Sequence, residues 1–341
     1  MENVSILGVG SYAMALAHLL GEKGYNVLMW SHDKEIADYI NTNHRNNIFL
    51  KDIVLPDNVS ATTDLNAMIT DCKFLLSVLP TQFIRGTLSK ISEEIGEDTI
   101  IINCAKGIEN DTLLTISEMF EEIFPKRIHS QFAFLSGPSF ALEVAKKQIT
   151  AVVVASHSTR VAVEARNLLN SSYFKAFTSK DIIGIEICGS LKNIIAIAAG
   201  IVDGLKLGAN TQAALITGGI AEITRIGLLK GANLATFLGL AGVGDLVLTA
   251  TGDLSRNRYV GQQLAKGKKL KDILSEMDMI AEGVKTTASA YELAKQLDIK
   301  VPIITEIYCI LYEDKPAKKA VEDLMRRNLQ SELGSTPFSK I

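Results

Sequence analysis

Short apolar runs recur through the first half of the chain, separated by stretches whose apolar residues follow a helical spacing. The first run, residues 4–7, is followed by two glycines and then, from Ser11 onward, by a stretch rich in Ala and Leu. Strands that alternate with helices predict right-handed crossovers and a mainly parallel sheet with helices on both faces. The other expected strands are residues 26–30, 74–79, 99–103, 132–135, 151–155 and 173–177, and expected helices between them are 84–95, 113–123 and 159–169.

The pattern changes after Asp181. From there on, long apolar stretches such as IEICGSLKNIIAIAAGIVDG and QAALITGGIAEITRIGLLKG have the spacing of buried helices. The predicted fold class is therefore α/β followed by all-α, with a Rossmann-like, mainly parallel sheet and a C-terminal helical domain. We assign residues 1–180 to the first domain and 181–341 to the second, with the boundary somewhere within 155–190 because no Pro- or Ser-rich linker marks it.

The composition narrows the class of protein. At 341 residues with 47% hydrophobic positions, the chain is long enough for two globular domains. A net charge of -3 gives no overall attraction to nucleic acid or to an anionic membrane, so neither is an expected partner. The N-terminus lacks signal-peptide features and no uninterrupted apolar run reaches membrane-spanning length, so we expect a cytoplasmic protein without an integral membrane segment.

The cysteines are scattered singly in apolar surroundings. This spacing disfavours both a zinc site and a disulfide framework. We expect them to be reduced core residues: Cys72, Cys104, Cys188 and Cys309.

The stretch VSILGVGSYAMALA, residues 4–17, places Gly8 and Gly10 where the first strand becomes a helix. In a dinucleotide-binding turn the first glycine permits the tight bend, the second lets the backbone approach the pyrophosphate, and the third position, here Ala13, must be small. The pattern alone would fit a structural loop equally well. Its place after the first strand of an α/β sheet favours dinucleotide binding, because backbone N–H groups and the helix dipole attract the anion there.

The second strand ends in WSHD, where a residue that reads the ribose is expected. Asp33 could bind the ribose hydroxyls, as in an enzyme that uses NAD. His32, Ser31 and Lys34 could instead tolerate the 2′-phosphate of NADP. The sequence leaves the choice between NAD and NADP open.

Lys192 lies inside the strongly apolar stretch IEICGSLKNIIAIAAG. A charged group is costly there unless it is paired or functional. Gly189, Ala196 and Ala199 share its helix face, so the small neighbours should leave the ammonium uncovered and open to a ligand. A lysine that extends to solvent is the plainer interpretation, but further polar residues on the same helix, Glu186 and Asn193, favour a functional lysine.

Three further segments carry candidate polar groups. Lys106 in CAKGIE follows the carboxyl end of a strand, the edge along which ligands bind in open α/β sheets. SGPSFA places Ser136 and Ser139 at another strand end. In AGVGDLVLTATGDLSRNRYVG, glycines surround Asp245, and SRNR combines a hydroxyl, an amide and two guanidiniums, which suits a phosphate. The alternatives are a solvated loop lysine for Lys106, a simple Gly-Pro turn for SGPSFA and a charged helix start for SRNR.

Taken together, these motifs resemble one family closely. GVGSYAMALA, WSHD, NCAKGIE, LSGPSFA, CGSLKNIIAIAAGIVDGL, AGVGDLVLT and SRNR occur in the order and approximate spacing of the bacterial NAD(P)-dependent glycerol-3-phosphate dehydrogenases, from residue 4 to about 320. The resemblance implies a Rossmann domain, a helical domain of the 6-phosphogluconate dehydrogenase C-terminal type, and interconversion of sn-glycerol 3-phosphate and dihydroxyacetone phosphate for phospholipid synthesis. One departure is Ala13-Met14, where the family usually has Gly-Thr.

The resemblance also implies roles for individual residues. Lys192 would be the proton acceptor. The implied substrate-binding residues are Lys106, Gly137, Ser139, Lys192, Asp245, Ser255, Arg256 and Asn257. The implied cofactor-binding residues are Ser11, Tyr12, His32, Lys106, Ala141, Arg256, Ile280 and Glu282, in addition to Gly8 and Gly10 of the glycine turn. No metal ion is implied, and a homodimer is left open.

The expected chemistry needs a base, because oxidation of a secondary alcohol removes a hydride from carbon and a proton from the hydroxyl. Lys192 can act as that base only as the neutral amine. Burial, a positive nicotinamide and Lys106 would favour the neutral form, and Asp245 would oppose it.

Two alternative functions stay open. A β-hydroxyacid or 6-phosphogluconate-type dehydrogenase would carry carboxylate-binding residues in place of SRNR, and a non-catalytic dinucleotide sensor would not need Lys106, Lys192 and Asp245 together.

Overall fold

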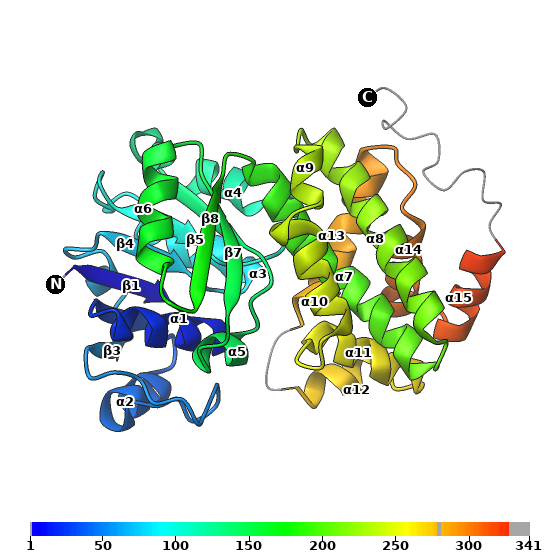
Figure 1. Ribbon diagram of the computed structural model, residues 1–341, viewed down its shortest axis with the longest axis horizontal. Helices are drawn as coiled ribbons and strands as arrows, with labels where there is room; N and C mark the ends of the chain where they lie inside the picture. Colours follow the sequence, from blue (N-terminus) through cyan, green and yellow to red (C-terminus); the bar gives the residue numbers. More distant parts are fainter. Residues whose placement is uncertain (1, 278–280, 327–341) are drawn as a thin grey trace. The chain divides into compact units, whose positions relative to one another are not determined.

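The chain folds into two compact units (Figure 1). The computed structural model describes residues 2–277 and 281–326. The first unit contains the chain up to Lys106 together with Ile116–Ile182, and the second contains Gly107–Thr115 and the chain from Ile183 onward. An α/β unit followed by a helical unit confirms the predicted fold class.

A sheet forms the centre of the first unit, and within the described residues it has eight strands in the order β3-β2-β1-β4-β5-β6-β7-β8. Neighbouring strands are parallel except β6 and β7, which are antiparallel. Strand β3, with the sequence VSAT, is additional to the prediction because it is short and half polar. The strands are β1 Asn3–Leu7, β2 Asn26–Trp30, β3 Val59–Thr62, β4 Phe74–Ser77, β5 Ile100–Asn103, β6 Phe132–Ser136, β7 Thr150–Ala155 and β8 Phe174–Ser179.

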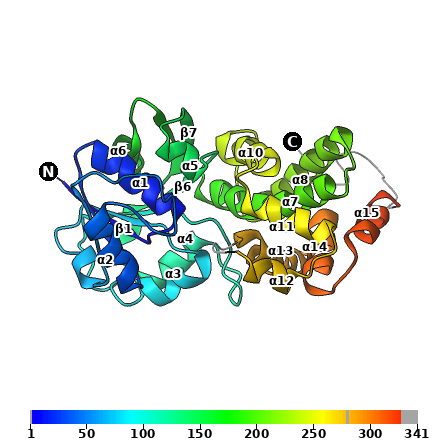
Figure 2. The same ribbon diagram turned by 90° about the horizontal axis from the view of Figure 1, so that it is seen from below.

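Helices cover both faces of this sheet, with α1, α5 and α6 on one face and α3 and α4 on the other (Figure 2). This arrangement buries the parallel strands on both sides, which explains their nearly continuous apolar sequences. The helices are α1 Ser11–Glu22, α2 Lys34–Asn43, α3 Thr81–Leu88, α4 Ile116–Ile123, α5 Ala141–Ala145 and α6 Thr159–Leu169, with 3-10 turns at Asn66–Met68 and Lys126–Gln131.

Two helices of this unit differ from their predicted limits. The helix expected over 84–95 begins at Thr81 and ends at Leu88, where the Ser89 hydroxyl donates back to the Arg85 carbonyl at 2.7 Å. The helix expected over 113–123 begins only at Ile116. Leu113 cannot belong to it, because its φ of 59° is left-handed.

The second unit is built around α7, whose side chains are nearly all buried. Glycines let α11 pack directly on it: a Cβ at Gly200 or at Gly261 would lie 1.9 Å from a backbone oxygen of the other helix. This close packing fixes α11 against the helix that carries Lys192. The elements are α7 Ile182–Gly204, α8 Ala209–Leu229, α9 Leu234–Phe237, a π-helical turn Leu240–Gly244, α10 Asp245–Thr251, α11 Arg256–Ala265, α12 Leu270–Ser275, α13 Glu282–Gln296, α14 Pro302–Tyr312 and α15 Ala317–Met325.

The segment Gly107–Thr115 belongs to the helical unit although it follows β5 of the sheet. Ile108 is fully buried in the hydrophobic core of the second unit. The Ser289 hydroxyl of α13 donates to Oδ1 of Asn110 at 2.8 Å, with the Ile108 carbonyl a second acceptor at 3.3 Å. Lys106 is therefore the last residue of the first unit before the chain enters the second unit at Gly107.

Within the described residues, two stretches are long and apolar enough, by length and composition, to cross a membrane, although the sequence prediction found no such run. Ile182–Gly204 is the core helix α7, and 94% of its apolar window is buried. Leu234–Thr251 is 39% buried and is interrupted at Gly242, whose backbone is not helical. Burial accounts for the apolar sequence of α7, and the expectation of no integral membrane segment stays a prediction.

The cysteines follow the expectation except at one position. Cys72, Cys104 and Cys188 are buried, and burial raises the pKa of the Cys104 thiol to about 12, so this thiol is not reactive near neutral pH. Cys309 is half-buried rather than a core residue, whereas its neighbours Ile307, Ile310 and Leu311 on α14 are buried. All four are free thiols.

Candidate active site

A tight glycine turn joins β1 to α1. Gly8 has a φ of 120°, which L side chains rarely adopt, and a Cβ there would lie 3.0 Å from the Val78 carbonyl oxygen. Gly10 precedes α1 without a side-chain cap, and its Cβ position has open space around it. Ser11 and Tyr12, both half-buried, begin the helix. The turn therefore offers a close backbone approach at the positive end of a helix dipole, as a pyrophosphate requires.

Asn46 braces this turn and was not identified from the sequence. Its side chain is 1% exposed, and its Nδ2 donates to the carbonyl oxygen of Val9, the residue between the two glycines, at 3.0 Å. Its Oδ1 accepts from the backbone N–H groups of Ile48 and Phe49 at 2.8 and 2.9 Å. An asparagine in an irregular connection gives no periodic signal, so only the fold reveals this contact.

The WSHD segment leads from β2 into α2. Oδ1 of Asp33 accepts from the backbone N–H of Glu35 at 2.8 Å, so this carboxylate caps the helix. The N–H of Asp33 donates to Oγ of Ser31 at 3.1 Å. His32 is exposed. The residue expected to read the ribose therefore also has a structural role.

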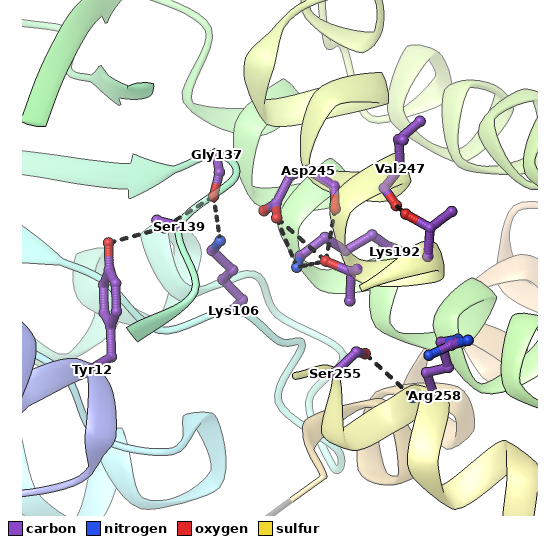
Figure 3. A network of polar contacts seen from close by, with 11 residues as sticks. Tyr12, Lys106, Gly137, Ser139, Lys192, Asp245, Val247, Ser255 and Arg258 are labelled. Atoms are coloured by element: carbon purple, nitrogen blue, oxygen red, sulfur yellow. Dashed lines mark hydrogen bonds and ion pairs between the residues drawn. The ribbon is translucent and has the colours of Figure 1, made fainter. Parts of the chain in front are cut away.

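A polar network joins three segments at the carboxyl end of the sheet (Figure 3). The Gly137 carbonyl accepts from Nζ of Lys106 at 3.2 Å and from Oγ of Ser139 at 3.1 Å. The Tyr12 hydroxyl lies 3.1 Å from the same Ser139 oxygen. The first turn of α1, the end of β5 and the end of β6 thus bring together residues predicted to bind cofactor and substrate.

Gly137 shapes this network through its backbone. Its φ is 129°, and a Cβ would lie 3.0 Å from Cα of Val152 on β7, so a glycine is required. Ala141, two residues after Ser139, is the half-buried first residue of α5. Ser136, by contrast, is buried within β6, with 3% of its surface exposed, so it is less accessible to a ligand than predicted.

Lys192 lies on α7 with 6% of its surface exposed. Its Nζ is 3.0 Å from Oδ1 of Asp245 and donates to Oγ1 of Thr249 at 2.6 Å (Figure 3). The prediction of an uncovered ammonium is wrong, because these two side chains of α10 lie against it. The buried charge of Lys192 is paired instead, and its partner is Asp245, which is 1% exposed.

Thr249 was missed by the sequence analysis. Its hydroxyl donates to the backbone carbonyl of Asp245 at 2.7 Å, so its oxygen is oriented to accept from Lys192. Thr249 lies four positions after Asp245, which places both on one face of a helix. A helical interpretation of DLVLT could have identified the threonine.

The SRNR segment starts α11, and its two arginines differ. Arg256 is exposed, whereas the guanidinium of Arg258 pairs with Asp203 at 2.5 Å and with Asp253 at 2.7 Å. Oγ of Ser255 accepts from the backbone N–H of Arg258 at 3.3 Å and caps the helix. The idea of two phosphate-binding guanidiniums is therefore wrong for Arg258, because packing against α7 commits it to ion pairs.

Asn257 of α11 contacts the start of α13. Oδ1 of Asn257, a residue 8% exposed, accepts from the backbone N–H of Gly283 at 3.0 Å. Glu282 is half-buried and is the first residue of that helix. Although Arg256 keeps solvent contact, surrounding protein lowers the pKa of its guanidinium, and the Glu282 carboxylate opposes this. The Arg256 guanidinium nevertheless stays positively charged, as arginine does in proteins.

Two predicted features remain to be placed. Ile280, expected to bind the cofactor, lies outside the described residues. Within 2–277 and 281–326, no group of three or more His, Cys, Asp or Glu side chains is arranged to hold a metal ion.

The fold and the site define a class, the nicotinamide-dinucleotide dehydrogenases that join a Rossmann-type unit to a helical unit with a buried lysine. Family models for the N-terminus and C-terminus of NAD-dependent glycerol-3-phosphate dehydrogenase match residues 3–162 and 181–322. The chain therefore belongs to the NAD(P)-dependent glycerol-3-phosphate dehydrogenase family, which confirms the resemblance seen in its motifs.

Individual relatives agree over nearly the whole length. Two relatives are named as NAD(P)+ glycerol-3-phosphate dehydrogenases. The one from Geobacter sp. (strain M21) is 46% identical to the chain and the one from Citrifermentans bemidjiense 47%, and each match covers 97% of the chain and 99% of the relative. The crystal structure of glycerol-3-phosphate dehydrogenase from Coxiella burnetii is 35% identical with a TM-score of 0.90, covering 96% of this chain and 99% of that one.

Proposed function

We propose that the chain interconverts dihydroxyacetone phosphate and sn-glycerol 3-phosphate with NADH or NADPH, and so supplies the glycerol backbone of phospholipids. The observation that carries this proposal is the buried Lys192–Asp245–Thr249 cluster on α7 and α10. The family membership supports it over a β-hydroxyacid or 6-phosphogluconate-type dehydrogenase and over a non-catalytic sensor.

The first unit has the features that a nicotinamide dinucleotide needs. Gly8 permits the tight turn, since a Cβ there would lie 3.0 Å from the Val78 carbonyl oxygen, and Gly10 leaves open space for a pyrophosphate at the start of α1. When bound, the nicotinamide supplies or accepts the hydride. The residues that we propose to bind the dinucleotide are Gly8, Gly10, Ser11, Tyr12, His32, Lys106, Ala141, Arg256, Ile280 and Glu282.

Lys192 moves the proton. Asp245 and Thr249 both accept from Nζ, so they hold the amine as a donor. In the reductive direction we propose that Nζ gives its proton to the C2 oxygen of the substrate, and in the oxidative direction the neutral amine takes that proton back. The Asp245 carboxylate stabilises the ammonium that forms.

The phosphate group is bound at the start of α11. Arg256 supplies a guanidinium that can make paired, charge-assisted hydrogen bonds to phosphate oxygens. Asn257 and Ser255 flank it, and the helix dipole favours an anion at the same end. From the first unit, Lys106, Gly137 and Ser139 are the remaining residues that we propose to contact the substrate.

A direct assay tests this function. Purified protein mixed with dihydroxyacetone phosphate should consume NADH or NADPH, followed by the loss of absorbance of the reduced nicotinamide. Oxidation of neither cofactor would overturn the proposal. Binding of NADH without any turnover would favour the sensor instead.

Because the Asn46 side-chain amide holds the glycine turn through the Val9 carbonyl, we expect cofactor affinity to depend on this amide. We expect Asn46→Asp to raise the KM for NADH about tenfold or more. Aspartate keeps an oxygen for the Ile48 and Phe49 N–H groups but loses the donor to Val9, so two oxygens face each other. Steady-state kinetics and fluorescence titration of NADH measure the effect.

Asn58→Asp is the matched control. The Nδ2 of Asn58 donates to the Gly21 and Tyr25 carbonyls in the same unit, away from the glycine turn. This variant loses a comparable amide donor and should leave the KM for NADH unchanged. Equal shifts in both variants would remove Asn46 as a specific brace.

The WSHD segment should influence cofactor choice. A carboxylate at position 33 repels a 2′-phosphate, and His32 could accept one, so we expect an enzyme that uses both cofactors. Asp33→Asn should raise kcat/KM for NADPH relative to NADH. Asparagine caps helices as well as aspartate does, so α2 should be preserved. An unchanged ratio in paired rate measurements would mean that the ribose is read elsewhere.

A homodimer and a cytoplasmic location stay predictions. Leu238, Val243 and Val247 of the second unit are exposed apolar side chains of the kind that an interface between two copies buries.

A further inference from the structure

A buried hydrogen bond joins the start of α11 to the start of α13. The N–H of Gly283 donates to Oδ1 of Asn257 at 3.0 Å, and both residues are buried. Asn257 is the second residue of α11, directly after Arg256, and Gly283 is the second residue of α13. The contact therefore ties a proposed phosphate ligand to an element 26 residues further along the chain.

This hydrogen bond fixes the orientation of the Asn257 amide. An amide side chain has an oxygen that accepts and an NH2 group that donates. A backbone N–H can only donate, so the atom that faces Gly283 is the oxygen. The NH2 group is consequently at the other end, where it can donate to a phosphate oxygen.

Gly283 also lies where α13 closely approaches both α7 and α11. A Cβ at this position would lie 2.7 Å from the backbone oxygen of Asn193, the residue after Lys192, and 2.7 Å from Oδ1 of Asn257. Cβ atoms do not approach backbone atoms so closely, and the Asn193 oxygen belongs to the middle of α7 and cannot easily move. Any side chain at 283 must therefore displace Asn257 or separate α13 from α7.

We propose that Gly283 is a positioning residue for recognition of the substrate's phosphate group. Its N–H fixes the orientation of the Asn257 amide, and its missing side chain leaves room for that amide and for the Asn193 carbonyl of α7. The proposal rests on the proposed function, because it assumes that Asn257 contacts the phosphate.

Gly283→Ala tests the proposal through substrate discrimination. The ratio of kcat/KM for dihydroxyacetone phosphate to that for unphosphorylated dihydroxyacetone should fall about tenfold or more, the size expected when one hydrogen bond to a charged group is lost. A purely structural defect would lower both values together and leave the ratio unchanged, which would overturn the proposal.

Gly227→Ala is the matched control. A Cβ at Gly227 on α8 would lie 2.3 Å from the ring of Phe237, so this variant also crowds the core of the second unit. Its thermal stability should fall, but its discrimination ratio should equal that of the wild type. A fall in the ratio of this control as large as that of Gly283→Ala would also overturn the proposal.

Asn257→Asp keeps the proposal falsifiable if Gly283→Ala does not fold. Aspartate retains an oxygen for the Gly283 N–H and replaces the NH2 group with a second oxygen that repels phosphate. The discrimination ratio should fall by more than tenfold, and an unchanged ratio would show that the NH2 end does not face the phosphate. Absence of wild-type turnover with dihydroxyacetone phosphate would instead refute the proposed function itself.

Discussion

Lys192→Met is expected to lower kcat for reduction of dihydroxyacetone phosphate by about 10²- to 10⁴-fold, the usual contribution of a general acid. Loss of the positive charge near the substrate oxygen should add to this. Binding of NADH, followed by fluorescence, should scarcely change, because the glycine turn belongs to the other unit. Methionine keeps much of the apolar volume of the lysine stem, so packing around α7 is largely retained.

The same variant should also lose stability. The structure places the buried Asp245 carboxylate 3.0 Å from Nζ, so the substitution removes its cation. Breaking a buried pair by removing one partner costs about 3–5 kcal/mol. The double variant Lys192→Met/Asp245→Asn should therefore recover thermal stability without recovering kcat.

Lys206→Met provides the matched control, because Lys206 is an exposed lysine just after α7 and should tolerate the change. A Lys192→Met protein that binds NADH normally and keeps more than about a tenth of wild-type kcat would eliminate Lys192 as the proton donor. Lys106 would then be the next candidate.

Arg256→Ala should have the second large effect. Loss of a paired, charge-assisted contact, with each hydrogen bond contributing roughly 1.5–3 kcal/mol, should lower kcat/KM for dihydroxyacetone phosphate by about two orders of magnitude or more. With NADH saturating, so that a weakened cofactor contact of Arg256 does not enter, the rate with unphosphorylated dihydroxyacetone should fall far less. Steady-state kinetics with both substrates measure this difference.

Arg258→Ala separates recognition from structure, because it removes a guanidinium two positions away that is paired with Asp203 and Asp253. We expect this control to lose thermal stability while discriminating the two substrates as the wild type does. If Arg256→Ala discriminates them equally well, Arg256 does not bind the phosphate.

The sequence predicted the features that leave a local signature. The parallel strands are buried on both faces and therefore read as apolar runs, whereas the half-polar β3 escaped notice. Gly8 and Gly10 stood out because they follow the first strand in the spacing of a dinucleotide-binding turn, and at Gly8 the φ of 120° excludes other residues. Lys192 stood out because a charge inside an apolar helix needs a reason.

Features that depend on contacts between distant segments could not be predicted in this way. The covering of Lys192 by α10 depends on residues 53 and 57 positions away in the chain, and the two arginines of SRNR differ only through packing against Asp203. Asn46 was missed because its three hydrogen bonds go to backbone atoms, which carry no sequence information.

The membership of Gly107–Thr115 in the helical unit has a consequence for how the two units can be exchanged between relatives. A chimaera joined once near residue 180 would combine the 107–115 segment of one parent with the helical core of the other. Ile108 is fully buried in that core, and Asn110 must meet Ser289 there, so a mismatch would leave an apolar side chain and a hydroxyl poorly accommodated. Functional recombinants should therefore require three junctions, at 106/107, 115/116 and 182/183, so that this segment is inherited with the helices on which it depends.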